Sequence, residues 1–526
     1  MDLKSFVETP AVPGHEAQLA AEIRLRLHAW SPQTDNIGDV AVTVGSGSPH
    51  RLLVAPMDEP GYVVSRIRDD GYLELQRLPQ FGLLPQFNEL YSAQPVEIET
   101  SSGKWINGIV AGLSVHLLPG RRNPSDPRDI TNMYVDIGAH TAAQARAAGA
   151  DLVEPLAIDR TVYEMGGGEW TAPAIGDRFG DAALIEVLRR LDPAKLKGTL
   201  TVAFVVQQWA GARGLECILT REKPDELIYV GRLLPSGSPL AAANRRFPSQ
   251  QPGSGVLAGM QNPAAGLTGL AAELQQIASN NGIRLTADYS APLIPRSYLP
   301  PPPIPARFAH LAIATKWAST PAEIIDTTDL SGLAALFEDY LQGSAERASF
   351  PRATFIGAPL LPPRPQSAPS PEAVLKTLTE TYGVSEHEEA VRAAVKRLLP
   401  AWAKTTTDPA GNLVLASPQA GAKGVLFVAH MDEIGYEVQS VLHDGRLSIV
   451  VRGGGLSYFF AGHAAFVHTE RGIRPGVIEL PDGWRDPGFI WPRGPGAAWF
   501  MDVGARTPAE IAALGIKKGD FITSPK

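Results

Sequence analysis

The chain has 526 residues, of which 44% are hydrophobic and 19% charged, and its formal net charge is −8. This composition is typical of a globular protein long enough to form several domains. The mild acidity and the lack of a Lys/Arg run argue against nucleic acid as a partner.

One cysteine, Cys217, occurs in the whole chain. It excludes an intramolecular disulfide framework and agrees with a reducing compartment, and its apolar neighbours in "GLECIL" predict a buried thiol. The first residues lack the basic and apolar pattern of a leader, and no run approaches the roughly twenty apolar residues of a membrane helix. We therefore expect a cytoplasmic protein without a membrane partner.

The first 345 residues predict an α/β domain interrupted by a β domain. A helix is expected within 14–30 and short strands at 40–44 and 51–59. Residues 66–163 then alternate short apolar pieces with Gly, Asn and Pro, which predicts a small inserted β domain of barrel-like type. Afterwards the α/β pattern resumes, with strands at 198–208, 226–231 and 309–317 and helices at 181–191, 266–283 and 329–342.

This order predicts an open mixed sheet flanked by helices, built from residues 1–65 and 164–345. The Pro- and Ser-rich stretch 346–370 is expected to be a linker. Residues 371–437 then predict a partial second α/β domain, and residues 438–526 a second inserted β domain.

Two similar sequence segments are the reason why the second half of the chain is expected to repeat the first. "LLVAPMDEPGYVV" at 52–64 corresponds to "LFVAHMDEIGYEV" at 426–438. The correspondence continues upstream, where Trp30 matches Trp402, and downstream, where Asp136 matches Asp502. The sequence therefore predicts an internal duplication of a domain-sized unit.

Four stretches carry a resemblance to a known family. They are "MDEPGY" with its second copy "HMDEIGY", "APAIGDRFGDAALIEVL", "VVQQWAGARG" and "WASTPAEIID". In this order, around a β insertion, they resemble the tetrahedral or glutamyl aminopeptidases, a family of metallopeptidases with two zinc or cobalt ions. The resemblance implies peptide substrates and assembly into homo-oligomers or with a related chain.

The resemblance also implies a chemistry in which two metal ions hold a water molecule and a carboxylate takes its proton. In the first copy, the positions that correspond to the metal ligands and the base carry other residues. Asp177 matches the second acid of the family's acidic pair, and Asp58 the aspartate that orients a ligand histidine. The ligand positions fall on Pro56, Gly176, Trp209, Gly231 and Ser319, and the base position on Gln208. We expect this copy not to hold the metal pair.

The second copy keeps one ligand position. His430 matches the family's first histidine, and Asp432 stands where an aspartate would orient its imidazole. The sequence reaches Lys526 before the positions of the other ligands, so His430 alone is not expected to form a catalytic site. His463 and His468 fall on opposite faces of a strand, and the neighbours Asp58 and Glu59 also diverge, so neither pair is expected to be catalytic.

Three functions remain open from the residues. The chain could be an inactive homologue that binds peptides or a related chain as a scaffold. It could be an active metal-dependent aminopeptidase whose site around His430 is completed by a partner chain or by residues beyond Lys526. It could also be a structural subunit of an assembly.

Overall fold

The computed structural model describes most of the chain, as two compact units. The described residues are 2–78, 86–111, 126, 128–158, 160–233, 250–260, 262, 264–289, 303–343, 370–400, 402–415, 426–455, 457–486, 488–492 and 497–526. Unit 1 comprises Met1–Glu164, Gly168–Arg352 and Gly483–Phe489, and unit 2 comprises Met165–Gly167, Ala353–Asp482 and Ile490–Lys526. The linker expected at 346–370 lies, except for Ser370, outside the described residues.

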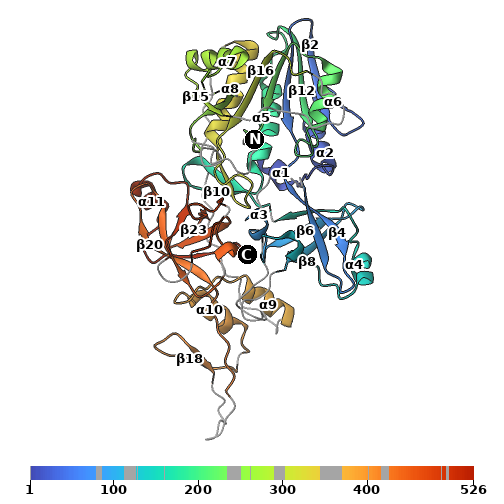
Figure 1. Cartoon of the computed structure of the whole chain (residues 1–526). Coiled ribbons are helices and arrows are strands. Elements are labelled where there is room, and N and C mark those ends of the chain that lie inside the picture. Colours follow the sequence, from blue (N-terminus) through green and yellow to red (C-terminus); the bar gives the residue numbers. More distant parts are fainter. Residues whose placement is uncertain are drawn as a thin grey trace. The chain divides into compact units, whose positions relative to one another are not determined.

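Unit 1 contains an eight-stranded mixed sheet in the order β1-β2-β12-β3-β13-β16-β14-β15 (Figure 1). Strand β3 lies at its centre, parallel to β12 on one side and to β13 on the other. The open mixed sheet predicted from the sequence is thus confirmed. The strands are β1 (Gln33–Thr34), β2 (Val40–Ser46), β3 (His50–Pro56), β12 (Gly198–Val205), β13 (Glu226–Val230), β14 (Val256–Met260), β15 (Leu285–Tyr289) and β16 (Arg307–Ile313).

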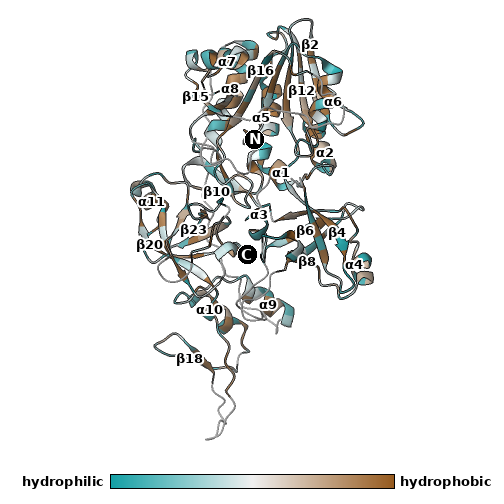
Figure 2. Ribbon diagram, viewed as in Figure 1, coloured by the Kyte–Doolittle hydropathy of each residue, from teal (hydrophilic) through white to brown (hydrophobic). Residues whose placement is uncertain are grey.

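Helices cover both faces of this sheet because its central strands are apolar on both sides (Figure 2). One face packs against α1, α2, α5, α7 and α8, with Phe179 and Phe337 in the core, and the other packs against α6. The helices are α1 (Leu3–Glu8), α2 (Ala17–Arg26), α5 (Ile175–Arg190), α6 (Arg213–Glu222), α7 (Gly269–Asn280) and α8 (Thr327–Gln342). A three-stranded sheet of β10 (Tyr163–Glu164), β11 (Glu169–Ala172) and β17 (Glu323–Asp326) adjoins α5 and α8.

Each unit also holds a closed six-stranded barrel, as the two β insertions predicted. In unit 1 the order is β4-β5-β8-β7-β6-β9, and in unit 2 it is β20-β21-β24-β23-β22-β25. The first barrel consists of β4 (Gly61–Ile67), β5 (Leu73–Leu78), β6 (Pro95–Glu99), β7 (Trp105–Val110), β8 (Tyr134–Asp136) and β9 (Pro155–Ile158). Along the chain, α3 (Gln86–Glu89) lies between β5 and β6, and α4 (Ala142–Ala148) lies between β8 and β9. The second consists of β20 (Gly435–Val441), β21 (Leu447–Arg452), β22 (Ala464–Thr469), β23 (Gly472–Ile478), β24 (Trp499–Asp502) and β25 (Phe521–Thr523), with α11 (Pro508–Leu514) before β25. The barrels begin at Gly61 and Gly435, slightly ahead of the expected boundaries at 66 and 438.

The remainder of unit 2 is a small set of elements ahead of its barrel. It contains the helices α9 (Pro371–Thr379) and α10 (Glu389–Leu398) and the hairpin of β18 (Thr405–Thr407) and β19 (Leu413–Leu415). In the described part of this region, no other strand pairs with the hairpin.

Two further expectations from the sequence concern membrane helices and the burial of Cys217. Within the described ranges, no helix is long and apolar enough to cross a bilayer. The expectation of a buried Cys217 is wrong, because α6 turns Leu215, Ile218 and Leu219 toward the sheet and leaves the thiol exposed.

The start of the first barrel depends on a close contact that admits no side chain. A Cβ atom at Gly61 would lie 2.2 Å from Cγ1 of Val12. Since valine is stiff about χ1, Gly61→Ala should lower the free energy of unfolding by about 1–3 kcal/mol, and Val12→Ala in the same chain should recover part of it. Urea unfolding followed by circular dichroism measures both variants. An unchanged midpoint in Gly61→Ala would contradict this packing.

Candidate active site

The carboxyl ends of three neighbouring strands bring four of the predicted site positions to one edge of the sheet. Pro56 ends β3, and in the parallel register it faces Val205, the last residue of β12. Gln208 and Trp209 follow β12, while Gly231 follows β13. A Cβ at Gly231 would lie 3.2 Å from Cδ of Pro56, so these two positions adjoin. The carboxyl edge of an α/β sheet is the usual place of its ligand site.

Two further positions meet around Glu323, the first residue of β17. The backbone N–H of Gly176 donates to Glu323 Oε2 at 2.8 Å, and the N–H of Ser319 donates to Oε1. A Cβ at Gly176 would lie 2.6 Å from Thr315 and 3.0 Å from Glu323 Oε2. The backbone of α5 therefore approaches Glu323 too closely for a larger residue at position 176.

Arg232 joins the acids of this region. Its Nε and Nη2 donate to the two carboxylate oxygens of Asp177 at 3.1 and 2.7 Å, and Nη2 also donates to Glu323 Oε1 at 2.7 Å. All three side chains are almost entirely buried. Burial alone would lower the pKa of Arg232, but the charges of Asp177 and Glu323 outweigh it and raise that pKa. A permanent guanidinium cation thus lies between two buried carboxylates.

The neighbours Asp58 and Glu59 point to different partners. Asp58 accepts hydrogen bonds from the N–H groups of Gln208 at 2.7 Å and Trp209 at 2.8 Å. Burial, assisted by the charge of Glu16, raises the pKa of Asp58 to about 8. Asp58 therefore fixes the turn after β12.

Glu59 is held by two buried arginines. Its carboxylate accepts from Arg160 Nη1, from Arg160 Nη2 at 2.7 Å and from Arg178 Nη2 at 2.7 Å. Each arginine also donates its Nε to a backbone carbonyl, that of Val7 or Phe6. With its lone pairs engaged in this way, Glu59 is not placed to accept a proton from water.

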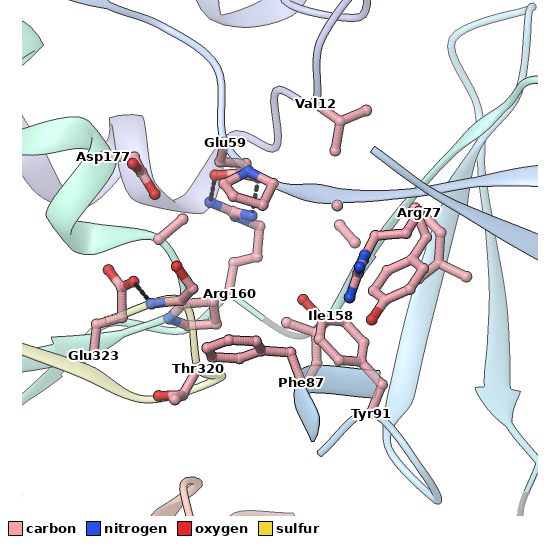
Figure 3. Close-up of a pocket in the computed structure, with 18 residues that line it drawn as sticks. Val12, Glu59, Arg77, Phe87, Tyr91, Ile158, Arg160, Asp177, Thr320 and Glu323 are labelled. Carbon is pink, nitrogen blue, oxygen red and sulfur yellow. Dashed lines mark hydrogen bonds and ion pairs between the residues drawn. The ribbon is translucent and has the colours of Figure 1, made fainter. Parts of the chain in front are cut away.

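A cleft of about 570 Å³, part of it open to solvent, lies against these residues in unit 1 (Figure 3). One wall is polar and carries Glu59, Asp177 and Glu323. The opposite wall comes from the first barrel and carries Arg77 and Tyr91 (Figure 3). The other lining side chains include Val12, Tyr62, Phe87, Leu156, Ile158 and Thr320.

The three histidines of unit 2 that the sequence analysis named differ in burial and in partners. His430 is 86% exposed, and its Nδ1 lies 3.2 Å from Asp432 Oδ1. His463 is buried with Nδ1 near the carbonyl of Ala461, whereas His468 contacts Thr523 and stacks on Phe521. Each of these three histidines has a separate set of partners.

The donor chemistry around the sheet edge does not fit a divalent metal pair. Pro56, Gly176 and Gly231 have no donor side chain, and the carboxylates of Asp177 and Glu323 are occupied by Arg232. Over the described ranges, no group of three or more His, Cys, Asp or Glu side chains is arranged to hold a metal ion.

Sequence reasoning did not identify Arg232 or Arg160 as part of this region, and it gave no role to Arg178, which lies in the quoted stretch "APAIGDRFGDAALIEVL". Glu323 lies in the quoted stretch "WASTPAEIID" and could have been noticed there. Arg232 had no signal of its own, because a single arginine after a strand is common and its partners are distant in the sequence.

Comparison with known proteins places this architecture. Residues 38–294 and 411–526 match the family described as M42 glutamyl aminopeptidase. The chain is 28% identical over 274 residues to the glutamyl aminopeptidase of Lactococcus lactis subsp. cremoris, which covers 49% of this chain and 75% of that protein. It is 27% identical over 216 residues to the lysyl aminopeptidase of Pyrococcus furiosus, with 40% and 60% covered.

Solved structures agree in fold. The TET1 peptidase of Pyrococcus horikoshii, which can assemble into a tetrahedron or a large octahedral shell, superimposes with a TM-score of 0.55. Its sequence is 23% identical, and the match covers 65% of this chain and 98% of that structure.

The arginine between the two acids yields a stability prediction. Arg232→Met should lower the free energy of unfolding by about 3–5 kcal/mol, because it leaves two buried carboxylates without their counter-charge. Adding Asp177→Asn should restore part of the loss, and Arg66→Met, which removes an exposed ion pair with Glu74, serves as the control. Urea unfolding of the four proteins gives the comparison. Equal stability of Arg232→Met and the parent chain would contradict the role of Arg232.

A second prediction concerns acid and His310, on β16. Its Nε2 lies 3.1 Å from the carbonyl of Gly231, and burial lowers its pKa to about 4. The unfolded chain therefore binds this proton first, so the stability contributed by neutral His310 is present above about pH 6.5 and is lost as the pH falls toward 4. In His310→Gln, urea midpoints measured from pH 7 to 4 should fall less steeply. Parallel pH profiles would show that His310 is not buried as a neutral group.

Proposed function

Because the chain belongs to the M42 glutamyl aminopeptidase family, we propose that it is a homologue whose first copy has lost the metal site and acts as a binding or scaffold domain. In this proposal unit 1 keeps the fold and the cleft but does not hydrolyse peptides. The charge network around Arg232 carries the argument.

The network supplies internally the positive charge that metal ions supply in a two-metal site. In such a site, the acids are gathered around two cations that also activate a water molecule. In unit 1 the guanidinium of Arg232 neutralises Asp177 and Glu323 and has no coordination position to offer to water. A guanidinium donates hydrogen bonds and cannot take up a proton, so it cannot replace the catalytic function.

The position of the family base supports the same interpretation. Gln208 stands there, and an amide cannot accept the proton of an attacking water at neutral pH. Asp58 and Glu59 are close in sequence but are held by backbone N–H groups and by two arginines, respectively. Every carboxylate among the described side chains of the cleft accepts hydrogen bonds from an arginine, so none is free to act as a base beside a metal ligand.

Binding without hydrolysis remains compatible with the cleft. Its barrel wall offers the aromatic rings of Tyr62, Phe87 and Tyr91 and the cationic Arg77, which suit an extended peptide with apolar groups. The named relatives are aminopeptidases, and a domain that retained their cleft would retain contact with peptides. Peptides are therefore the ligand class that we propose for unit 1.

A duplication explains why the ligand histidine survives in unit 2. Paired contacts recur at corresponding positions. The N–H of Glu59 donates to the carbonyl of Ala11 at 2.9 Å, and the N–H of Glu433 donates to that of Gly383 at 2.8 Å. In the reverse direction, Ala11 and Gly383 donate to the carboxylates of Glu59 and Glu433.

The barrels support the duplication independently. Their strand orders correspond element by element, and the first strand of each has an irregularity at the same place, between Val64 and Arg66 and between Val438 and Ser440. We propose that one ancestral unit gave rise to both halves and that Pro56 marks the copy released from metal binding.

One observation favours a second candidate, an enzyme completed around His430. The imidazole of His430 lies beside Asp432, which Ser385 also contacts, so a ligand histidine and its orienting acid remain together. This candidate requires the other ligands and the base from outside the described residues.

Metal content distinguishes the two candidates. We expect the purified and dialysed chain to contain far less than one zinc or cobalt ion per molecule by elemental mass spectrometry, and His430→Ala to give the same value. With either metal added, unblocked chromogenic amino acids should not be hydrolysed.

An enzyme completed around His430 would give a different result. About two metal ions per chain, lost in His430→Ala and accompanied by release of N-terminal residues, would favour the completed enzyme over the inactive homologue.

A further inference from the structure

An apolar segment of unit 2 is exposed where its counterpart in unit 1 is fully buried. Leu426, Phe427 and Val428 are 84%, 91% and 82% exposed. They precede His430 and, among the described residues, form no strand pair. Three adjacent large apolar side chains in this state are unusual on a protein surface and mark an interaction site.

The first copy shows what covers this sequence. In the alignment of the segments 52–64 and 426–438, residues 426–430 match residues 52–56 of β3. In unit 1, Leu52, Leu53 and Val54 have no exposed surface, and β3 pairs in parallel with β12 on one side and β13 on the other. Side chains of β3 enter the cores on both faces of the sheet.

The hairpin of unit 2 has a matching vacant edge. Its strands β18 and β19 correspond in sequence to β1 and β2, and in unit 1 the second edge of β2 pairs along its length with β12. Val414 and Leu415 on β19 are instead exposed, and β18 is the one described strand that pairs with them, so the other edge of β19 has no described partner. In unit 1, then, β12 is the strand that joins β2 to β3, whereas among the described residues of unit 2 no strand pairs with the counterparts of both.

The end of the exposed segment is held in place. Glu433 is bound to Gly383 through both backbone and side chain, and Asp432 contacts Ser385 and His430. The chain therefore leaves the barrel at a fixed point, which lowers the entropy cost of docking a strand beside residues 426–430.

We propose that unit 2 is an acceptor for an extended apolar strand of a second polypeptide, which enters antiparallel to β19 and parallel to residues 426–430. This inference rests on the duplication proposed above and names its partner. The strand has the chemistry of β12, "GTLTVAFV": uncharged, rich in Val, Thr and Phe, and apolar on both faces. Main-chain hydrogen bonds supply the affinity and alternate side chains the specificity, as in other cases of strand addition.

A second copy of the chain is a poorer occupant. Its exposed residues 426–430 could pair edge to edge with the same segment, but such a dimer would leave the edge of β19 vacant. In unit 1, by contrast, β12 pairs with β2 and β3 together.

Hydrogen exchange of the full chain tests the proposal. The probe is a synthetic peptide with the sequence of Gly198–Val205 and lysines at both ends for solubility, and the control is a scrambled peptide. We expect the probe to slow exchange of the amides of residues 426–430 and 413–415 roughly tenfold or more, because these groups enter strand hydrogen bonds.

Matched variants make the test specific. Val428→Glu places a charge in the docking segment and should abolish the protection, whereas Leu25→Glu makes the same kind of change at an exposed position of α2 and should leave it intact. Both residues are exposed in the free chain, so neither variant should disturb folding.

Two results would overturn the proposal. One is the absence of protection by the probe at any soluble concentration. The other is protection of 426–430 without peptide that increases with protein concentration, which would identify a second copy as the occupant. Neither result depends on metal content, so failure here is distinguishable from failure of the inactive-homologue proposal.

Discussion

The ion pairs of Arg232 with Asp177 and Glu323 are the interaction on which the site of unit 1 depends. Three charged groups come from α5, from the end of β13 and from β17, and they meet where burial excludes water. Removing Arg232 would leave both carboxylates without a counter-charge in a region of low dielectric. The network therefore holds three distant segments together, and it does so with a covalently attached cation.

Unit 1 has the framework of a ligand site, but the ionisable groups of this site are already engaged. The sheet edge, the cleft and the barrel wall are present, and the backbone N–H groups of Gly176 and Ser319 bind Glu323 as part of the same framework. Groups that would have to change protonation or coordinate a metal are instead engaged with arginines or backbone. The function proposed for unit 1 keeps a binding surface without the reaction, since function resides in particular side chains and not in the fold.

Much of the fold could be predicted because it follows from periodicity. The apolar strands β3, β12, β13 and β16 and the helices α5, α7 and α8 have patterns that burial imposes on sequence, and the alternation within the two β insertions predicted barrels. The short helix α1 and the strands β14 and β15 were missed, because few residues and nearby glycines give a weak pattern.

The site was less accessible to prediction for a physical reason. The positions Pro56, Gly176 and Gly231 could be named from the resemblance; the structure brings Pro56 and Gly231 together at one sheet edge and places Gly176 beside Glu323. The arginine partner of Asp177 and Glu323 could not be found, because its pairing with them is set by the packing of segments far apart in the sequence. The apolar sequence of Leu426–Val428 by itself predicts a buried strand, and its exposure is seen only in the structure.

Under the proposed function, unit 1 is held by its own cation and binds no metal. Hydrogen exchange of the β3 and β13 amides, measured across a urea series in EDTA and in increasing zinc, tests it most directly. A site for zinc in the native state would raise the stability of these strands with the logarithm of the metal concentration. We expect the same unfolding midpoint for these amides in EDTA and at every zinc concentration; a midpoint that rises steadily with zinc would show that unit 1 binds the metal.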